Sequence, residues 1–228
     1  MANMYLFGAS GHGKVIKEIV EADGNCVHAF VDDNLSIDVF CGRRVLHDAT
    51  GLSPIIVSIG NNSVRKTIVD KLSCNFATAI HPSAIVSPSA TIDEGTVVMA
   101  GAIINAEAVI GRHCIVNTGA SVDHDCQIAD FAHIAPHATL AGGVTVGECS
   151  WIGAGAVVKQ YVNIGRNCIV GAGAVVLNDV PDGTTVVGVP ARIIKANNMC
   201  ISNLQMGGVK PTYQLMLHNN GKGVYYAA

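Results

Sequence analysis

His124 is the strongest candidate for a catalytic base in this chain, because an acidic residue stands on each side of it, Asp123 and Asp125. An imidazole titrates near neutral pH, as a group that removes a proton in catalysis must. A neighbouring carboxylate can orient the ring and raise its basicity, and either Asp125 or Asp123 could do so. Gly142 stands 18 residues after His124. Its backbone N–H is a candidate donor to an oxyanion formed during the reaction.

Three polar clusters in the first 80 residues each come directly after an apolar stretch that predicts a strand, at 4–7, 26–31 and 54–59. Helical patterns come after the first cluster and the third cluster, so these elements predict a small parallel α/β sheet. The carboxyl ends of parallel strands meet at one edge, where such sheets bind ligands. The clusters are Gly8-Ala9-Ser10-Gly11-His12-Gly13, Asp32-Asp33 and Gly60-Asn61-Asn62.

The first cluster is a glycine-rich turn that leads into a helix, and a helix N-terminus offers free N–H groups and a positive dipole to phosphate. The acidic pair lies about twenty residues further on, where a contact with a ribose or base is expected. The glycine spacing is GxxGxG instead of the dinucleotide fingerprint GxGxxG, which argues against NAD.

The rest of the chain is dominated by a six-residue repeat. Every sixth residue from Val86 to Val176 is Val, Ile or Leu, and the residue two positions earlier is small in all hexads except those with Val144 and Val162. An α-helix cannot place a six-residue period on one face, whereas short strands joined by turns can. The repeat therefore predicts a β-solenoid. Glycine is frequent at the turns and suits tight corners: Gly111, Gly147, Gly153, Gly165 and Gly171.

Composition narrows the function classes. Half of the 228 residues are hydrophobic, 14% are charged, and the net charge is −3 without a basic run. These values favour an ample core and do not suggest binding to nucleic acid or to a membrane surface. No apolar stretch is long enough for a membrane helix and no signal peptide opens the chain, so we expect a cytoplasmic protein. Three of the eight cysteines fill small positions of the repeat and are expected to pack in the core: Cys114, Cys126 and Cys168.

The order of these motifs resembles the hexapeptide-repeat sugar acetyltransferases, in the subfamily of sialic acid O-acetyltransferases and UDP-4-amino-sugar N-acetyltransferases of bacillosamine synthesis. The resemblance covers residues 4–195 and includes the closing sequence Val187-Gly188-Val189-Pro190-Ala191-Arg192. It implies a small Rossmann-like α/β domain at 1–80 and a left-handed, three-sided parallel β-helix at 81–195, with roughly 18 residues per coil. Residues 196–228 form a tail of unknown role that could contain a hairpin.

The resemblance also implies the roles of individual residues. It places the catalytic base at His124, followed by an acidic residue that is Glu in a related enzyme and Asp125 here. It implies an acetyl-CoA contact at His133 and a homotrimer whose active sites lie between subunits. Ala154 and Ala172, 18 residues apart, are small enough for the pantetheine arm to pass. The implied contacts to the nucleotide sugar are Ser10, Gly11, His12, Asp32, Asp33 and Gly60.

These expectations describe direct transfer from acetyl-CoA to the 4-amino group of a UDP-linked amino-sugar, without a metal. O-acetylation of a sugar or sialic acid is the nearest alternative. A binding scaffold without catalysis is another. A β-helix carbonic anhydrase is the third, because three converging histidines could bind zinc; the candidates are His113, His124, His133 and His137.

Overall fold

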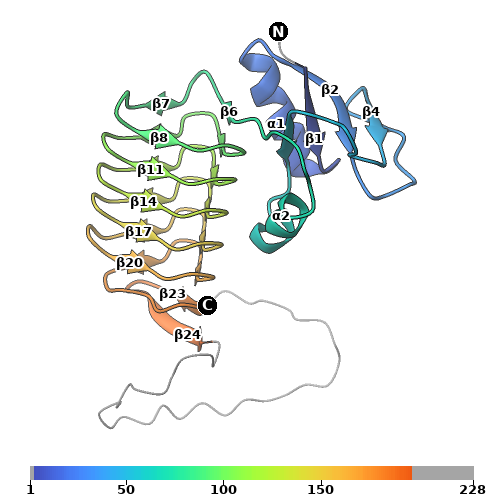
Figure 1. Cartoon of the computed structure of the whole chain (residues 1–228). Coiled ribbons are helices and arrows are strands. Elements are labelled where there is room, and N and C mark those ends of the chain that lie inside the picture. Colours follow the sequence, from blue (N-terminus) through green and yellow to red (C-terminus); the bar gives the residue numbers. More distant parts are fainter. Residues whose placement is uncertain (1–2, 197–228) are drawn as a thin grey trace, which may run out of the picture. The chain divides into compact units, whose positions relative to one another are not determined.

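The computed structural model describes residues 3–196, and these include a five-stranded sheet followed by a three-sided stack of coils (Figure 1). The hairpin predicted in the tail lies outside the described residues. The domain boundaries predicted at residues 80 and 195 stay predictions. None of the helices within 3–196 is long and apolar enough to cross a membrane.

The N-terminal sheet has the strand order β3-β4-β2-β1-β5. β1 pairs in parallel with β2 and β5, and β2 pairs in parallel with β4, as the alternating pattern predicts. The hairpin of β3 and β4 was not predicted, so the sheet is mixed. The bounds are β1 (Asn3–Phe7), β2 (Cys26–Val31), β3 (Val39–Phe40), β4 (Arg43–Leu46) and β5 (Ile55–Val57).

Two helices come after the polar clusters. α1 (Gly11–Ala22) buries Ile16, Ile19 and Val20 of its predicted apolar stripe, whereas Val15 of that stripe is exposed. α2 (Asn62–Val69) begins after Asn61, whose side chain accepts a hydrogen bond from the Val64 N–H at 3.0 Å. That bond satisfies one of the N–H groups that a helix start leaves without a partner.

The hexads form short parallel strands that lie in three sheets, one on each side of the coils. Each strand pairs with the strands one coil before and after it; Ile103 lies opposite Ser121. The first side contains β7 (Ile85–Val86), β10 (Ile103–Ile104), β13 (Ser121–Val122), β16 (Thr139–Leu140), β19 (Val157–Val158) and β22 (Val175–Val176). The second contains β8 (Thr91–Ile92), β11 (Val109–Ile110), β14 (Gln127–Ile128), β17 (Thr145–Val146) and β20 (Asn163–Ile164). The third contains the parallel strands β6 (Ala79–Ile80), β9 (Val97–Val98), β12 (Ile115–Val116), β15 (His133–Ile134), β18 (Trp151–Ile152), β21 (Ile169–Val170) and β23 (Thr184–Val187), and also β24 (Arg192–Ala196), which pairs antiparallel with β23.

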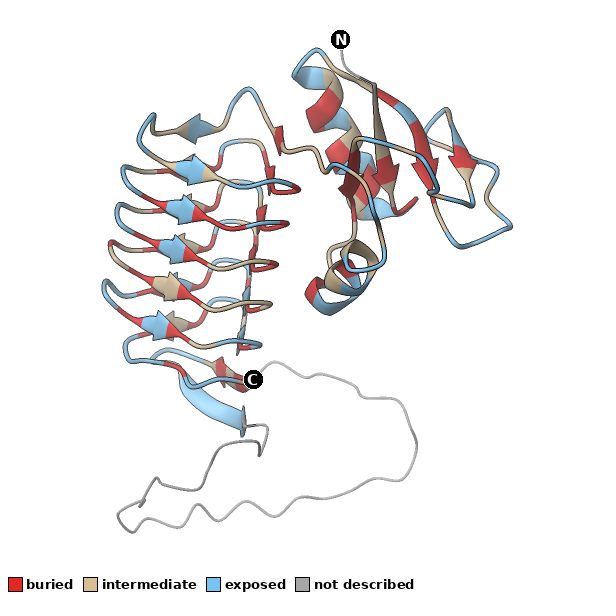
Figure 2. Cartoon of the chain, viewed as in Figure 1, coloured by how far each residue is buried: buried red, intermediate tan, exposed pale blue. Residues whose placement is uncertain are grey.

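The aliphatic and small positions of the repeat meet inside the coils, which confirms the predicted solenoid (Figure 2). Leu140 and Ala138 are fully buried, and so is Val144, one of the two exceptions to the small-residue rule. Cys114, Cys126 and Cys168 belong to the same core and are free thiols. Burial raises the pKa of the Cys114 thiol to about 12.

One residue in most of the hexads turns the chain through a left-handed backbone conformation. From Gly95 to Gly173, every sixth residue has φ between 52° and 71°. Glycine occupies some of these corners, and the others are Glu107, His113, Asp125, Phe131, His137, Cys149, Tyr161 and Asn167.

The interpretation of Gly111 and its equivalents as the corner residues was wrong, because they do not have positive φ. They are glycine because the next coil comes too close. A Cβ at Gly147 would lie 2.5 Å from the carbonyl carbon of Gly165, and one at Gly153 would lie 2.5 Å from the Val170 oxygen.

Gly95→Ala should destabilise the protein more than Gly155→Ala, although both residues are corners. A Cβ at Gly95 would lie 2.0 Å from Nδ1 of the buried His113, whereas one at Gly155 would meet no atom within 4 Å. Gly155→Ala should therefore lower the free energy of unfolding only by the left-handed backbone cost, about 1 kcal/mol, and Gly95→Ala by clearly more. Urea denaturation of both variants would measure this, and equal losses would contradict it.

Candidate functional site

His124 lies at the corner between β13 and β14, with its side chain about half exposed. Its Nδ1–H donates to Oδ2 of Asp125 at 2.7 Å. Asp125 is one of the left-handed corner residues, with φ 60°, and its shorter side chain still reaches the ring. This contact leaves Nε2 unprotonated and able to accept a proton.

Asp123, the residue before His124, contacts the backbone of the same corner and not the ring. Its Oδ1 accepts the backbone N–H of His124 at 2.8 Å and the amide of Asn105 at 2.9 Å. The Asp125 contact above all, and the charge of Asp123 as well, raise the pKa of His124 above its usual value of 6.5. Asp125 is thus the carboxylate that orients the ring.

Gly142 lies directly against the His124 ring, as the spacing of one coil predicts. A Cβ at Gly142 would come within 2.5 Å of Nε2, so only glycine leaves room for the ring in this position. The neighbouring Gly143 N–H donates to the His124 carbonyl oxygen at 2.9 Å. The Gly142 N–H itself donates to no group within residues 3–196. A free N–H beside a base is the arrangement that an oxyanion donor needs.

The glycine-rich cluster connects β1 to α1 in a tight turn. A Cβ at Gly13 would lie 2.4 Å from the Gly8 oxygen, so helix and strand approach closely here. Ser10 stands before the helix and its side chain does not cap it. The exposed Gly11 and the residues after it therefore present the open N-terminus of a twelve-residue helix.

The acidic pair divides into two roles. The Asp32 carboxylate accepts the Ala9 N–H at 2.8 Å and the Asn34 N–H at 2.9 Å, so it holds the glycine turn in place. Asp33 is exposed and has its carboxylate available for a ligand.

A buried arginine connects the α/β part to the coils. Arg65 is 1% exposed and lies on α2. Its guanidinium donates to the carbonyl oxygens of Ile59 and Gly60 in the α/β part, at 2.9 and 3.2 Å. It also donates to those of His113 and Phe131 in the coils, both at 2.8 Å. Burial lowers the pKa of Arg65 to about 10, which leaves it charged at neutral pH.

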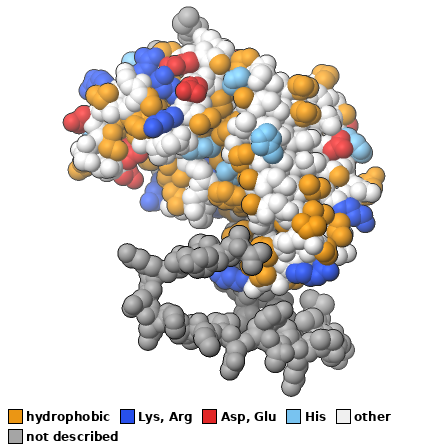
Figure 3. Space-filling view, turned by 180° about the vertical axis from the view of Figure 1, so that it is seen from behind, with side chains coloured by type: hydrophobic (Ala, Val, Ile, Leu, Met, Phe, Trp, Pro, Cys, Tyr) orange, Lys and Arg blue, Asp and Glu red, His pale blue; other side chains and the backbone are white. Residues whose placement is uncertain are grey.

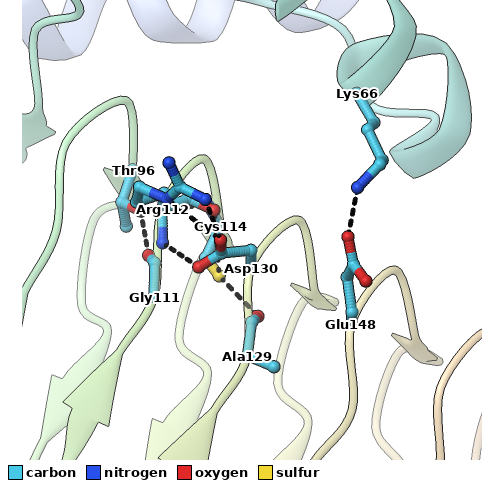
Figure 4. Close-up of polar contacts among 8 residues, drawn as sticks. All are labelled: Lys66, Thr96, Gly111, Arg112, Cys114, Ala129, Asp130 and Glu148. Atoms are coloured by element: carbon cyan, nitrogen blue, oxygen red, sulfur yellow. Dashed lines mark hydrogen bonds and ion pairs between the residues drawn. The ribbon is translucent and has the colours of Figure 1, made fainter. Parts of the chain in front are cut away.

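Two further contacts join α2 to the same side of the coils. The Asn62 side-chain amide donates to the carbonyl oxygens of Cys149 and Ser150 at 3.0 and 3.1 Å. Lys66 forms an ion pair with Glu148 (Figure 4).

His133 lies where the α/β part meets the coils, on β15. Its Nδ1 is 3.4 Å from the Gly60 oxygen, and its Nε2 is 3.0 Å from the Asn117 amide. Asn117 Oδ1 accepts the Thr118 N–H, so its NH₂ group faces the ring and His133 carries its proton on Nδ1. Burial first, then the charge of Arg65, lowers the pKa of His133 to about 3.

His12 faces the same place. Its ring centroid lies 6.4 Å from that of His133, and its buried Nε2 has no hydrogen-bond partner in the described part of the chain. Burial and the Arg65 charge lower its pKa to about 4, so the ring is neutral at physiological pH. An unpaired buried nitrogen is costly unless a ligand satisfies it.

Ala154 and Ala172 lie apart from both the His124 corner and the His133 region. Both are exposed and come after strands of the third side, and the Gly173 N–H donates to the Ala154 oxygen at 2.8 Å. They thus occupy the corner at one edge of the β13 side, whereas His124 occupies the corner at its other edge. Within one chain, the structure brings together His124, Asp125 and Gly142, and separately His12, Gly60 and His133, but it does not join the two groups.

Two residues of this region, Asn117 and Trp151, escaped the sequence analysis, and so did the burial of His113, which was considered there only as a possible zinc ligand. Asn117 orients His133, and the Trp151 ring lies 4.5 Å from the His133 ring. His113 is buried and stacks on Phe131 at 5.2 Å. His113 stands at a left-handed corner, and its type gives no sign of burial. Among residues 3–196, no group of three His, Cys, Asp or Glu side chains could hold a metal ion, so the zinc alternative gains no support from them.

Arg65→Ala should lower the free energy of unfolding by about 3 kcal/mol or more, because it removes the donor from four carbonyl oxygens at a buried junction. Arg112→Ala is the matched control. Arg112 pairs with Asp130 at 2.7 Å on the surface (Figure 4), and losing an exposed pair costs at most about 1 kcal/mol. Urea denaturation of both variants would measure the difference, and a loss at Arg65 as small as that at Arg112 would contradict the prediction.

Two family models match the chain. The PglD N-terminal domain matches residues 3–72, and the bacterial transferase hexapeptide (six repeats) matches residues 143–178.

The chain is similar to N-acetyltransferases named for UDP-linked sugars and to others named for GDP-linked sugars. The chain is 45% identical over 112 residues to the UDP-N-acetylbacillosamine N-acetyltransferase of Bacillus subtilis (strain 168), a match that covers 42% of this chain and half of that protein. It is 33% identical to the GDP-perosamine N-acetyltransferase of Escherichia coli O157:H7, over 85% of this chain and 97% of the relative. The crystal structure of a mutant of perosamine N-acetyltransferase from Caulobacter crescentus, in complex with CoA and GDP-perosamine, is 43% identical with a TM-score of 0.81. That match covers 85% of this chain and 97% of the other.

Proposed function

Because the chain belongs to the hexapeptide-repeat N-acetyltransferases of nucleotide-linked amino-sugars, we propose that it transfers an acetyl group from acetyl-CoA to the amino group of such a sugar. The observation that carries this proposal is the His124 corner. There, a carboxylate-bound imidazole presents Nε2 beside a backbone N–H that has no partner within the described residues.

The reaction is direct. The neutral amine attacks the thioester carbonyl carbon, and Nε2 of His124 takes the proton that the nitrogen loses. The Gly142 N–H stabilises the negative charge on the carbonyl oxygen. The C–S bond then breaks, and the thiolate of CoA leaves. Asp125 stabilises the imidazolium that forms, since its carboxylate accepts from Nδ1.

The acceptor binds to the α/β part. The open N-terminus of α1, with Ser10, Gly11 and His12, suits the diphosphate of a nucleotide sugar. The unpaired Nε2 of His12 is available to a polar group of the sugar. Asp33 and Gly60 complete the cradle, while Asp32 supports it by holding the turn. The proposed acceptor is a UDP-linked 4-amino-sugar, and the corresponding GDP-linked sugar is the rival, since relatives of both types are similar to the chain.

The active site requires a second copy of the chain. The base lies at one edge of the β13 side, and the groups proposed for acetyl-CoA, His133, Ala154 and Ala172, lie at or beyond its other edge. Each side spans about six residues, so the edges are up to about 20 Å apart. This side also exposes apolar residues, with Ile85 64% and Val157 41% exposed. Figure 3 shows hydrophobic side chains distributed over the rear face of the molecule. In a homotrimer whose subunits pack through the β13 side, the His124 corner of one copy lies against the edge of the next copy that contains Ala154 and Ala172.

His124→Ala should reduce kcat by about 10²-fold or more, the usual contribution of a general base. Release of the CoA thiol from acetyl-CoA would be measured with UDP-, GDP- and CMP-linked sugars that carry a 4-amino or a hydroxyl group. Turnover with a UDP-linked 4-amino-sugar that is lost in the variant supports the proposal. Turnover with hydroxyl acceptors alone would instead show O-acetylation. Acetyl-CoA binding without turnover would favour a scaffold.

Activity should fall as the pH decreases through the pKa of His124, because only the neutral imidazole accepts a proton. The two flanking carboxylates raise this pKa above 6.5, so the loss should begin at a higher pH than for an ordinary histidine. A pH profile of kcat at saturating substrates measures it, and an activity that stays constant down to about pH 5 would contradict His124 as the base.

A further inference from the structure

We propose that Asp123, anchored by Asn105 of the preceding coil, is a second positioning residue for the base: it holds the backbone of His124 while Asp125 holds the ring. This inference rests on the proposed function, in which His124 takes the proton. It gives separate roles to two carboxylates that the sequence presents as competitors.

The geometry separates the two roles. Oδ1 of Asp123 accepts the His124 N–H at 2.8 Å, and this bond fixes the peptide from which the imidazole extends. The same oxygen accepts the Asn105 amide at 2.9 Å, so the carboxylate is held from the coil before. Asp125 is attached separately, since its N–H donates to the Ala106 oxygen at 3.0 Å. A ring that must meet a substrate held by another copy benefits from a fixed backbone.

The choice of Asn105 as the anchor keeps the carboxylate ionised. A neutral amide donates without adding a positive charge that would cancel the effect on His124. The Asn105 bond first, then the His124 N–H, lowers the pKa of Asp123, so its charge is present wherever His124 titrates.

Few other charges face this corner. Asp125 belongs to the same turn, and Glu107 stands one coil before it at the equivalent left-handed position. The coil after it contributes Ala141, Gly142 and Gly143, which do not titrate, and the next coil carries Lys159 and Tyr161. Glu107 therefore has a similar charge at the same corner, but it makes no hydrogen bond to the turn of His124 among the described residues.

Three variants separate charge from position. Asp123→Asn keeps an oxygen that can accept the His124 N–H but removes the charge, so the loss of kcat on the acid side of the pH profile should move to lower pH. Asn105→Ala keeps the charge and removes the anchor, so kcat should fall several-fold without that movement. Asp123→Ala removes both, and kcat should fall about tenfold or more together with the movement.

NMR titration of the His124 ring measures its pKa without turnover, and Glu107→Gln is the matched control. The proposal requires a clearly larger decrease of that pKa in Asp123→Asn than in Glu107→Gln. Equal decreases would show that any carboxylate at this corner affects the pKa of His124 alike, and this would overturn the proposal. An Asn105→Ala variant with unchanged kcat would also overturn it.

Failure of the proposed function gives a different result. In that case His124→Ala keeps its turnover, and both the base and its positioning residue are rejected. If His124→Ala is inactive while Asp123→Asn and Asp123→Ala match the wild-type profile, only the positioning role of Asp123 is rejected.

Discussion

The stacking of each coil on the next is the constraint on which the structure depends. Strands pair with those one coil away, so a residue at a corner lies against the residue one coil later. This places Gly142 against His124 and Asn105 beside Asp123. The same regularity that closes the hydrophobic core therefore brings together groups from three consecutive coils: the Asn105 amide, the proposed base His124 with its two carboxylates, and the Gly142 N–H. Local sequence proximity supplies the contacts of His124 with Asp123 and with Asp125.

The buried charge of Arg65 is the second organising feature. A guanidinium out of contact with water is costly unless acceptors surround it. Here its acceptors are carbonyl oxygens from both parts and the Asn62 side chain, at 2.8 to 3.2 Å. After burial, which is the larger cause, its charge also lowers the pKa of His12 and of His133. The electrostatics of the proposed sugar site thus depend on the residue that attaches the α/β part to the coils.

The sequence predicted the features that periodicity determines and failed where side-chain type carries no signal. The hexads predicted the sheets, the buried Leu140 and Ala138, and the stacking of Gly142 on His124. The left-handed corners were missed because residues as different as Phe131 and Asp125 occupy them. Burial of Arg65 was also missed, since arginine is usually exposed. Within the single chain, His124 is separate from His133 and Ala154. Whether the His124 of one copy lies beside the His133 and Ala154 of another depends on the proposed assembly.

The left-handed corners have a consequence for how this scaffold can vary. A residue with a Cβ in this conformation carries a backbone penalty of about 1 kcal/mol that glycine avoids. Glycine is therefore the neutral choice at a corner, and each other residue there adds a small conformational strain that the packed core sustains. At Asp125 the strain places a carboxylate on the imidazole. At Asn167, which belongs to a different corner from His124, the side chain is exposed, and the strain there can be removed by evolution or design without changing the surroundings of the proposed base.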